Sequence, residues 1–271
     1  MKSFFGLPAI IAFVVFCTSA TLCAQTLVPI HNESFIRGEK LMFKAYYDSF
    51  VTGKVQAGTA TLEIKFEDKK IDGRSTFHIV GEGKSKGAFN LFYKVNDRFE
   101  SYMDEEYLVP WTFIRNTHEG SYSYEDEIRF NQYSGNFSSR RANKVMKTGT
   151  HDILSAFYYC RTLDFSNLKA GERFPVNFAL DDSVYISLIE FEGREDVITD
   201  LGTFHCLKFK PMVATGNVFS QPYPMDVWVT DDKNRMPVLA RSAVIVGSVK
   251  LELIDYKGLA NPVTALVKNS K

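Results

Sequence analysis

The chain has 271 residues, and its 32 lysines and arginines balance 32 aspartates and glutamates to give a formal net charge of zero. A balanced charge without basic blocks gives no electrostatic footprint for nucleic acid or for an anionic membrane surface. Aromatic residues are abundant, with 23 Phe, 13 Tyr and 2 Trp. Such a chain can bury a substantial core and still have rings for a binding surface or cavity.

The first residues have the layout of a secretory signal peptide. Lys2 gives a positive start, 9–16 is an uninterrupted apolar run, and 18–24 is small and weakly polar. This layout predicts a signal peptide over 1–24, cut between Ala24 and Gln25. We therefore expect an exported protein, periplasmic or otherwise outside the cytoplasm, that is not an integral membrane protein after cleavage.

Two alternatives to cleavage are an uncleaved anchor and a lipoprotein. The uncharged segment 4–24 is nearly long enough for an uncleaved anchor, but Pro8 and the short apolar core argue against that. Acylation on Cys23 would make a lipoprotein, but Leu22 stands where a small residue is expected. Residues 25–271 are predicted to form a single β-rich domain.

The dominant period of this domain is two. Apolar and charged residues alternate strictly in 61–67, which is typical of a half-buried strand. The same reasoning predicts further strands, in chain order near 40–47, 75–81, 121–131, 173–180, 183–192, 203–210, 225–230, 236–247 and 249–253. We expect a mainly antiparallel all-β fold, built as a large curved sheet or half-barrel.

One segment breaks this rhythm. Apolar residues in 152–163 fall close to helical spacing, and Thr150 or Asp152 is placed to cap the first turn. The pattern predicts one amphipathic helix over 152–163, packed against the sheet.

The chain also hints at an internal duplication. Gly38-Glu39 and Gly171-Glu172 each open a predicted strand, and an acidic turn precedes both Pro110 and Pro237. Related halves over 35–150 and 165–256 would explain the shared order, and chance resemblance between hairpins is the alternative.

Several motifs together carry a family likeness. They are Gly38-Glu39, the run from Tyr93 to Phe99, Asp152-Ile153-Leu154-Ser155 with Tyr159 and Arg161, Gly202-Thr203-Phe204, and Trp228 to Asp232 with Pro237. In this order they resemble the bacterial exported proteins grouped as domain of unknown function 3108, over roughly residues 35–256. The resemblance implies an envelope-localised, β-rich domain and brings no activity or catalytic residue with it.

Cys160 and Cys206 are the cysteines that remain after the predicted cleavage. In an oxidising compartment they form either a disulfide or two separate buried thiols, because both lie among apolar residues.

The sequence gives little support for a catalytic site. Ser85 lies in a G-x-S-x-G match, but the strand–helix alternation that this motif needs is missing. The five histidines are scattered without metal-ligand spacing, so we expect no metal, no cofactor and no enzyme activity. The acidic turns at 104–106 and 231–232 are interpreted as solvated turns or Asx-type turn starters.

The aromatic residues leave more room for function. The predicted ligand-binding residues are Tyr46, Tyr47, Phe92, Tyr93, Tyr122 and Tyr124. They would line a concave groove for an apolar ligand, unless they serve ordinary core packing. The leading hypothesis is a non-enzymatic module that binds an apolar ligand or an envelope component. The alternatives are a protein–protein interaction module in envelope assembly and, ranked last, a hydrolase.

Overall fold

The computed structural model describes residues 26–50, 53–212, 224–244 and 247–269. The predicted signal peptide, 1–24, lies outside these residues. Within them, no helix combines the length and the apolar character needed to cross a membrane.

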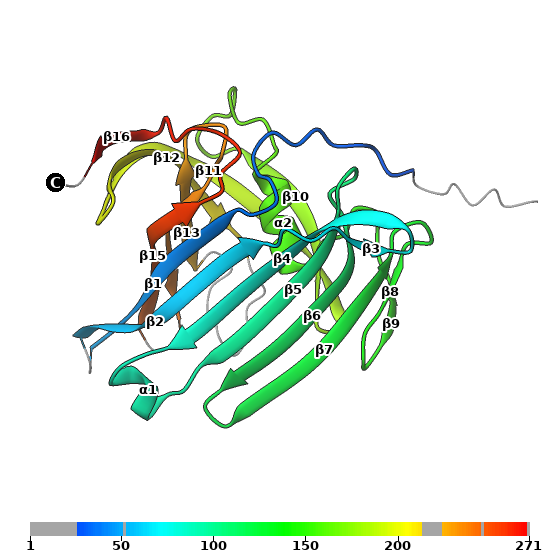
Figure 1. Cartoon of the computed structure of the whole chain (residues 1–271), viewed down its shortest axis with the longest axis horizontal. Helices are drawn as coiled ribbons and strands as arrows, with labels where there is room; N and C mark the ends of the chain where they lie inside the picture. The colour runs from blue at the N-terminus through cyan, green and yellow to red at the C-terminus, as the bar shows by residue number, and fades with distance from the viewer. Residues whose placement is uncertain (1–25, 51–52, 213–223, 245–246, 270–271) are drawn as a thin grey trace, which may run out of the picture.

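The described chain forms one continuous, strongly curved antiparallel sheet (Figure 1). The first half comprises β1 (Lys40–Ser49), β2 (Gly53–Ile64), β3 (Lys69–Ile71), β4 (Arg74–Ser85), β5 (Asn96–Asp104), β6 (Pro110–Glu119), β7 (Tyr122–Asn131), β8 (Asn136–Ser138) and β9 (Asn143–Val145). The second half comprises β10 (Arg173–Leu180), β11 (Ser183–Thr199), β12 (Gly202–Pro211), β13 (Met225–Thr230), β14 (Pro237–Ala243), β15 (Ser248–Lys257) and β16 (Leu266–Asn269). The helices are α1 (Phe89–Phe92) and α2 (Ile153–Cys160).

Pairing of β1 with β15 joins the two halves into one sheet. The strand order is β10-β11-β12-β13-β14-β15-β1-β2-β4-β5-β6-β7-β8-β9, with β3 on β4 and β16 on β12. At the other edge of the sheet, β10 pairs with His151, which precedes α2. The N–H of His151 donates to the Asn177 carbonyl at 2.9 Å, and its carbonyl accepts from Ala179 N–H at 2.7 Å. The sheet therefore curls toward closure, as expected for a half-barrel.

The predicted period of two is confirmed in the sheet. Along β7 the side chains of Tyr124, Asp126, Ile128 and Phe130 are buried, and those between them are exposed.

Each strand predicted from the sequence has a counterpart, and several are longer than predicted. The strand predicted over 61–67 ends at Ile64, and Phe66 beyond it is 80% exposed. The strand predicted over 236–247 ends at Ala243, and 245–246 lie outside the described residues. The pattern missed β3, β5, β6, β8, β9, β16 and α1.

The predicted helix is present and shorter than expected, ending at Cys160. Of the two predicted caps, Asp152 is the one used: its carboxylate accepts from Leu154 N–H at 2.8 Å and Ser155 N–H at 2.9 Å. The Ser155 hydroxyl accepts from Asp152 N–H at 3.0 Å, completing a capping box.

Helix α2 lies on the inner side of the curved sheet (Figure 1). Tyr158, which is fully buried, packs in one apolar cluster with Ile64 and Ile79 of β2 and β4. Leu154 joins the same cluster from the first turn of the helix. This packing fixes the helix over one part of the concave face.

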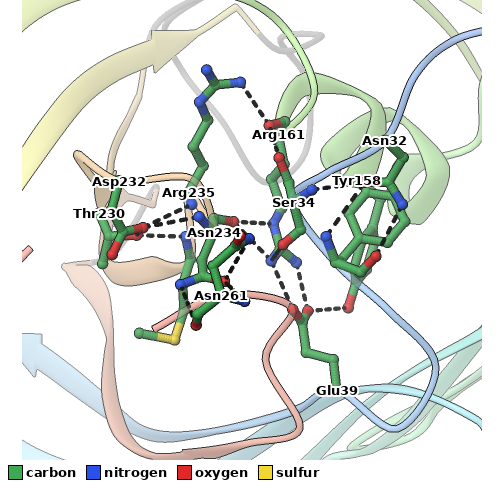
Figure 2. A network of polar contacts seen from close by, with 12 residues as sticks. Asn32, Ser34, Glu39, Tyr158, Arg161, Thr230, Asp232, Asn234, Arg235 and Asn261 are labelled. Carbon is green, nitrogen blue, oxygen red and sulfur yellow. Dashed lines mark hydrogen bonds and ion pairs between the residues drawn. The ribbon is translucent and has the colours of Figure 1, made fainter. Parts of the chain in front are cut away.

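A buried ion pair fixes the end of α2 (Figure 2). The Arg161 guanidinium donates to both carboxylate oxygens of Glu39, at 2.6 and 2.8 Å, and both side chains are almost completely buried. Burial lowers the pKa of Arg161, but the Glu39 carboxylate raises it more, so that the pKa stays above its ordinary value. Arg161 also donates to the carbonyls of Ser34 and Asn234. The pair therefore joins α2, the segment before β1 and the β13–β14 turn.

The two acidic turns singled out in the sequence share a hydrogen-bond pattern. Asp104 accepts from the N–H groups of Glu106 and Tyr107, and Asp232 accepts from those of Asn234 and Arg235. Both are Asx-type turns, as interpreted from the sequence. Asp104 itself is buried, however, so its turn is not a solvated one. The internal duplication stays a prediction.

Candidate binding site

Small residues cover part of the concave face, at the end of the sheet that carries α1. Directly paired residues of adjacent strands share a face. Gly83 of β4 pairs with Ala60 of β2, and Ser85 pairs with Gly58, which in turn pairs with Ala45 of β1. These five small residues form what we call the small-residue floor. Gly58 itself has no room for a side chain, because a Cβ atom there would collide with the backbone carbonyl of Lys84.

Helix α2 covers only the first part of β4. A Cβ atom built on Gly81 would lie 3.3 Å from a methyl group of Leu154, so the helix fills the space above this residue. Gly83 lies two positions further toward α1 on the same face. Around a Cβ atom at Gly83, no atom of the described residues lies within 4 Å. As far as the described residues extend, the concave face is therefore open over Gly83.

An aromatic array borders this open space. The ring of Tyr47 on β1 lies 5.8 Å from that of Phe89 in α1, and Phe89 lies 6.4 Å from Tyr93. Tyr93 in turn reaches the β6–β7 turn, because a Cβ atom at Gly120 would lie 3.0 Å from its ring. The array thus runs from β1 across α1 to the tip of the β6–β7 hairpin.

The structure separates the six predicted ligand-binding residues into four groups. Tyr47 and Tyr93 belong to the array. Tyr122 and Tyr124 stack on β7 with their rings 6.4 Å apart, and Tyr124 also lies under the guanidinium groups of Arg115 and Arg141. Phe92 projects into solvent from α1.

Tyr46 lies on the opposite face of β1 from Tyr47, because successive strand residues point to opposite sides. There the ammonium groups of Lys54 and Lys250 approach its ring at 4.6 and 5.7 Å. Tyr46 therefore does not border the open space. Phe89 does, although it was not among the six residues predicted to bind.

The opposite wall of the concave face is charged. Asp97 of β5, which pairs with Gly83, accepts from His118 N–H at 2.9 Å. Burial and the adjacent Asp97 carboxyl raise the pKa of Glu119 above its ordinary value. Small residues thus lie on the β1, β2 and β4 side of the concave face, and Asp97 and Glu119 place carboxyl groups on the β5 and β6 side, where Arg115 also lies on the same face of β6.

Replacing Glu119 by glutamine is expected to stabilise the fold at neutral pH. A carboxyl whose pKa is raised on folding is easiest to accommodate when protonated, so its cost appears as pH rises through the folded pKa. The variant removes that cost and keeps a hydrogen-bonding group. Urea unfolding should show a gain for Glu119→Gln at pH 8 that disappears at pH 4. An equal gain at both values would contradict the assigned ionisation.

A separate cavity of about 600 Å³ lies beside Tyr124. It is lined mainly by charged side chains of β6, β7 and the segment after β8, including Arg115, Asp126, Arg129 and Arg140. A charged lining of this kind does not suit an apolar ligand. We therefore place the candidate site over Gly83.

Ser85, the serine of the G-x-S-x-G match, supports the connection between β4 and β5. Its hydroxyl donates to Asn90 Oδ1 at 2.5 Å and accepts from Val95 N–H at 2.8 Å. These bonds hold α1 and the array in place.

The disulfide considered between Cys160 and Cys206 is not formed in the structure, where both are free thiols. Burial raises the pKa of each thiol to about 12, so both are neutral and poorly reactive at neutral pH.

Comparison with solved structures supports the fold. The chain is similar to a β-barrel-like protein of the domain of unknown function DUF1849 from Brucella abortus, with a TM-score of 0.51 and 8% identity over 83% of this chain and 98% of that one. It is more distantly similar to an exported protein with a YmcC-like fold from Bacteroides fragilis, with a TM-score of 0.32 and 12% identity over 86% of this chain and 100% of that one. The first likeness concerns the fold alone, and the second carries no argument.

Comparison with known sequences gives the family. No curated protein matches the chain. Residues 43–254, which run from β1 into β15, match the family described as protein of unknown function (DUF3108). The match covers most of the chain and agrees with the resemblance drawn from its motifs. The chain therefore belongs to the DUF3108 family.

Proposed function

We propose that this protein is exported and binds an apolar ligand in the space over Gly83. The observation that carries the proposal is the open concave face at Gly83, beside the ring array of Tyr47, Phe89 and Tyr93. Ligand sites in proteins are concave and mostly apolar, with a few polar groups that orient the ligand. Export is supported by the signal-peptide pattern of the first 24 residues.

The charged wall limits which ligands fit. An apolar body would lie on the small-residue floor, with its polar end toward Asp97 and Glu119. These carboxyl groups would repel an anionic end and attract a neutral donor or a cation. We therefore expect an amphiphilic molecule that carries a neutral or positively charged polar group.

A glycine-to-valine substitution tests the site directly. Gly83→Val would place two methyl groups in the open space, and we expect it to weaken binding of N-phenyl-1-naphthylamine, a fluorescent apolar probe, at least about tenfold. The fold should not suffer, because valine is well suited to strands and glycine is not.

The matched control is Lys84→Val, which changes the next residue of β4 on the opposite face. It should leave probe affinity unchanged. Circular dichroism and thermal unfolding would establish that both variants fold. Equal affinity of the Gly83→Val variant and the wild-type protein would overturn the proposed site.

The natural ligand can be sought without a probe. Protein purified from its native envelope would be extracted with organic solvent, and the extract analysed by mass spectrometry. A stoichiometric amphiphile in the wild-type extract, absent from that of Gly83→Val, is the expected result. Extracts without a ligand, together with no probe binding, would contradict the proposed function and favour a protein partner.

A further inference from the structure

Exposed apolar side chains gather at the end of the sheet that carries α1. Phe50 is fully exposed after β1, and Leu91 and Phe92 of α1 are 84% and 88% exposed. Tyr93 and Tyr122 are about half exposed, at 45% and 50%. We call these five residues the tip surface. They come from three successive turns of the first half, which lie together in the lower part of Figure 1.

Single exposed apolar side chains are ordinary on protein surfaces, but a cluster of them marks an interaction site. Leu91 and Phe92 are adjacent in a one-turn helix none of whose residues is buried. Exposure of these side chains to water is unfavourable, because burial of apolar surface stabilises a protein. Their exposure together indicates that something outside the described chain covers them.

Lysines predominate around the tip surface, although the exposed Asp48 of β1 lies opposite Lys54. Lys86 and Lys94 flank α1, and Lys54 follows the β1–β2 turn, and all three are exposed. The segment 86–96 contains no acidic residue. Glu119, at the neighbouring hairpin, is directed to Asp97 on the concave side. Aromatic and aliphatic side chains surrounded by lysines suit the interface of a bilayer that carries anionic lipids.

We infer that this end of the protein docks on the surface of an anionic lipid bilayer, with Phe50, Leu91 and Phe92 inserted among the headgroups. Phe92 was predicted to bind the ligand, and in this arrangement it serves the membrane instead. Docking would place the mouth of the candidate site against the lipid surface, so that an amphiphile could pass between them. This inference rests on the tip surface and stands whether or not a ligand binds over Gly83.

The neutral composition of the whole chain gave no footprint for an anionic membrane. A net charge for the whole chain does not describe how the charges are distributed. Lys86 and Lys94 flank α1 in a segment without acidic residues, whereas Asp48 and Glu119 lie at the neighbouring turns of the same end. Electrostatic attraction to a surface acts within about 10 Å at ordinary ionic strength, so the local charge decides.

Vesicle co-sedimentation tests the inference. The purified protein should bind vesicles of phosphatidylethanolamine and phosphatidylglycerol more tightly than vesicles of phosphatidylcholine, and 0.5 M salt should weaken the binding. The double variant Phe50→Ser, Leu91→Ser should lower the partition coefficient at least about tenfold. The pair Lys86→Glu, Lys94→Glu should act in the same direction on anionic vesicles alone.

Ile198→Ser is the matched control, because Ile198 is also highly exposed, at 81%, and lies at the opposite end of the sheet on β11. It should bind vesicles like the wild-type protein. Absence of binding to anionic vesicles, or unchanged binding of the Phe50→Ser, Leu91→Ser variant, would overturn the inference. Crosslinking of this end to a protein without vesicle binding would overturn it in favour of a protein partner.

The same variants keep this inference separate from the proposed function. Phe50 and Leu91 lie outside the ring array, so their substitution should leave probe binding intact. Gly83→Val should lose the probe and still bind vesicles. Each hypothesis can therefore fail without the other.

Discussion

Replacing Arg161 by alanine is expected to lower the free energy of unfolding by about 3–5 kcal/mol, because it leaves the Glu39 carboxylate buried without its cation. Glu39 would retain only the hydroxyl of Tyr158, at 3.2 Å. The carbonyls of Ser34 and Asn234 would lose their donor as well. Denaturant unfolding monitored by circular dichroism measures the effect.

Two controls separate the buried charge from other losses. The double variant Glu39→Leu, Arg161→Met removes both charges, and it should be more stable than Arg161→Ala because no unpaired ion remains. Arg129→Ala removes an arginine whose side chain is 74% exposed in its ion pair with Glu127, and it should cost less than about 1 kcal/mol. Equal losses for Arg129→Ala and Arg161→Ala would contradict the role of the buried pair.

The sequence predicted those strands that have one buried face and one face exposed to solvent. β7 alternates in this way and was found. β2 was found as well, although most of its residues are only partly buried. β6 was missed because Phe113 and Ile114 are adjacent apolar residues, which breaks the period of two. The short strands β3, β8 and β9 have three residues each, too few for any period to appear.

The buried ion pair was not predicted as a feature of the core. In a single sequence Glu39 and Arg161 look like the charged residues of any solvated turn, and 122 residues separate them. The available signal was indirect, since both residues stand within the motifs that carry the family likeness. Only the folded topology, which a single sequence does not show, places the start of β1 beside the end of α2.

The candidate site was predicted in part. Aromatic excess pointed to the residues around α1, and the alternation along β1 already indicated that Tyr46 and Tyr47 face opposite sides. Gly83 was not predicted as a site residue; in the sequence it is the first glycine of the G-x-S-x-G match around Ser85. Its place in the floor depends on how far α2 covers β4, and the first turn of the helix packs Leu154 over Gly81 but does not reach Gly83.

Replacing Asp104 by alanine is the second change with a large expected effect, a loss of about 3 kcal/mol or more at pH 7. The buried carboxylate accepts from Trp111 Nε1–H at 2.8 Å and from two backbone N–H groups of its own turn. Arg74 donates to it from two nitrogens. The substitution leaves the indole N–H and the turn unsatisfied, and a buried donor without a partner costs its full desolvation.

Glu106→Ala is the control for this prediction. Glu106 also pairs with Arg74, at 2.9 Å, but its side chain is 52% exposed. An exposed ion pair is worth less than about 1 kcal/mol. If Glu106→Ala were as destabilising as Asp104→Ala, the loss would belong to Arg74 and not to the buried carboxylate. Trp111 fluorescence reports directly on the side chain that loses its acceptor.

The pH dependence of Asp104→Ala follows from the ionised state of the carboxyl group. Burial raises the pKa of Asp104, but the bonds from Arg74, the turn and Trp111 lower it more, so the folded pKa lies below the ordinary 3.8. A group with a lowered folded pKa contributes its stability above the unfolded pKa and loses it as pH falls through the folded value. The stability difference between wild type and Asp104→Ala should therefore be largest at neutral pH and shrink on acidification below about 4. A difference that stays constant down to pH 2 would mean that lost packing, and not the charge, explains the effect of the substitution.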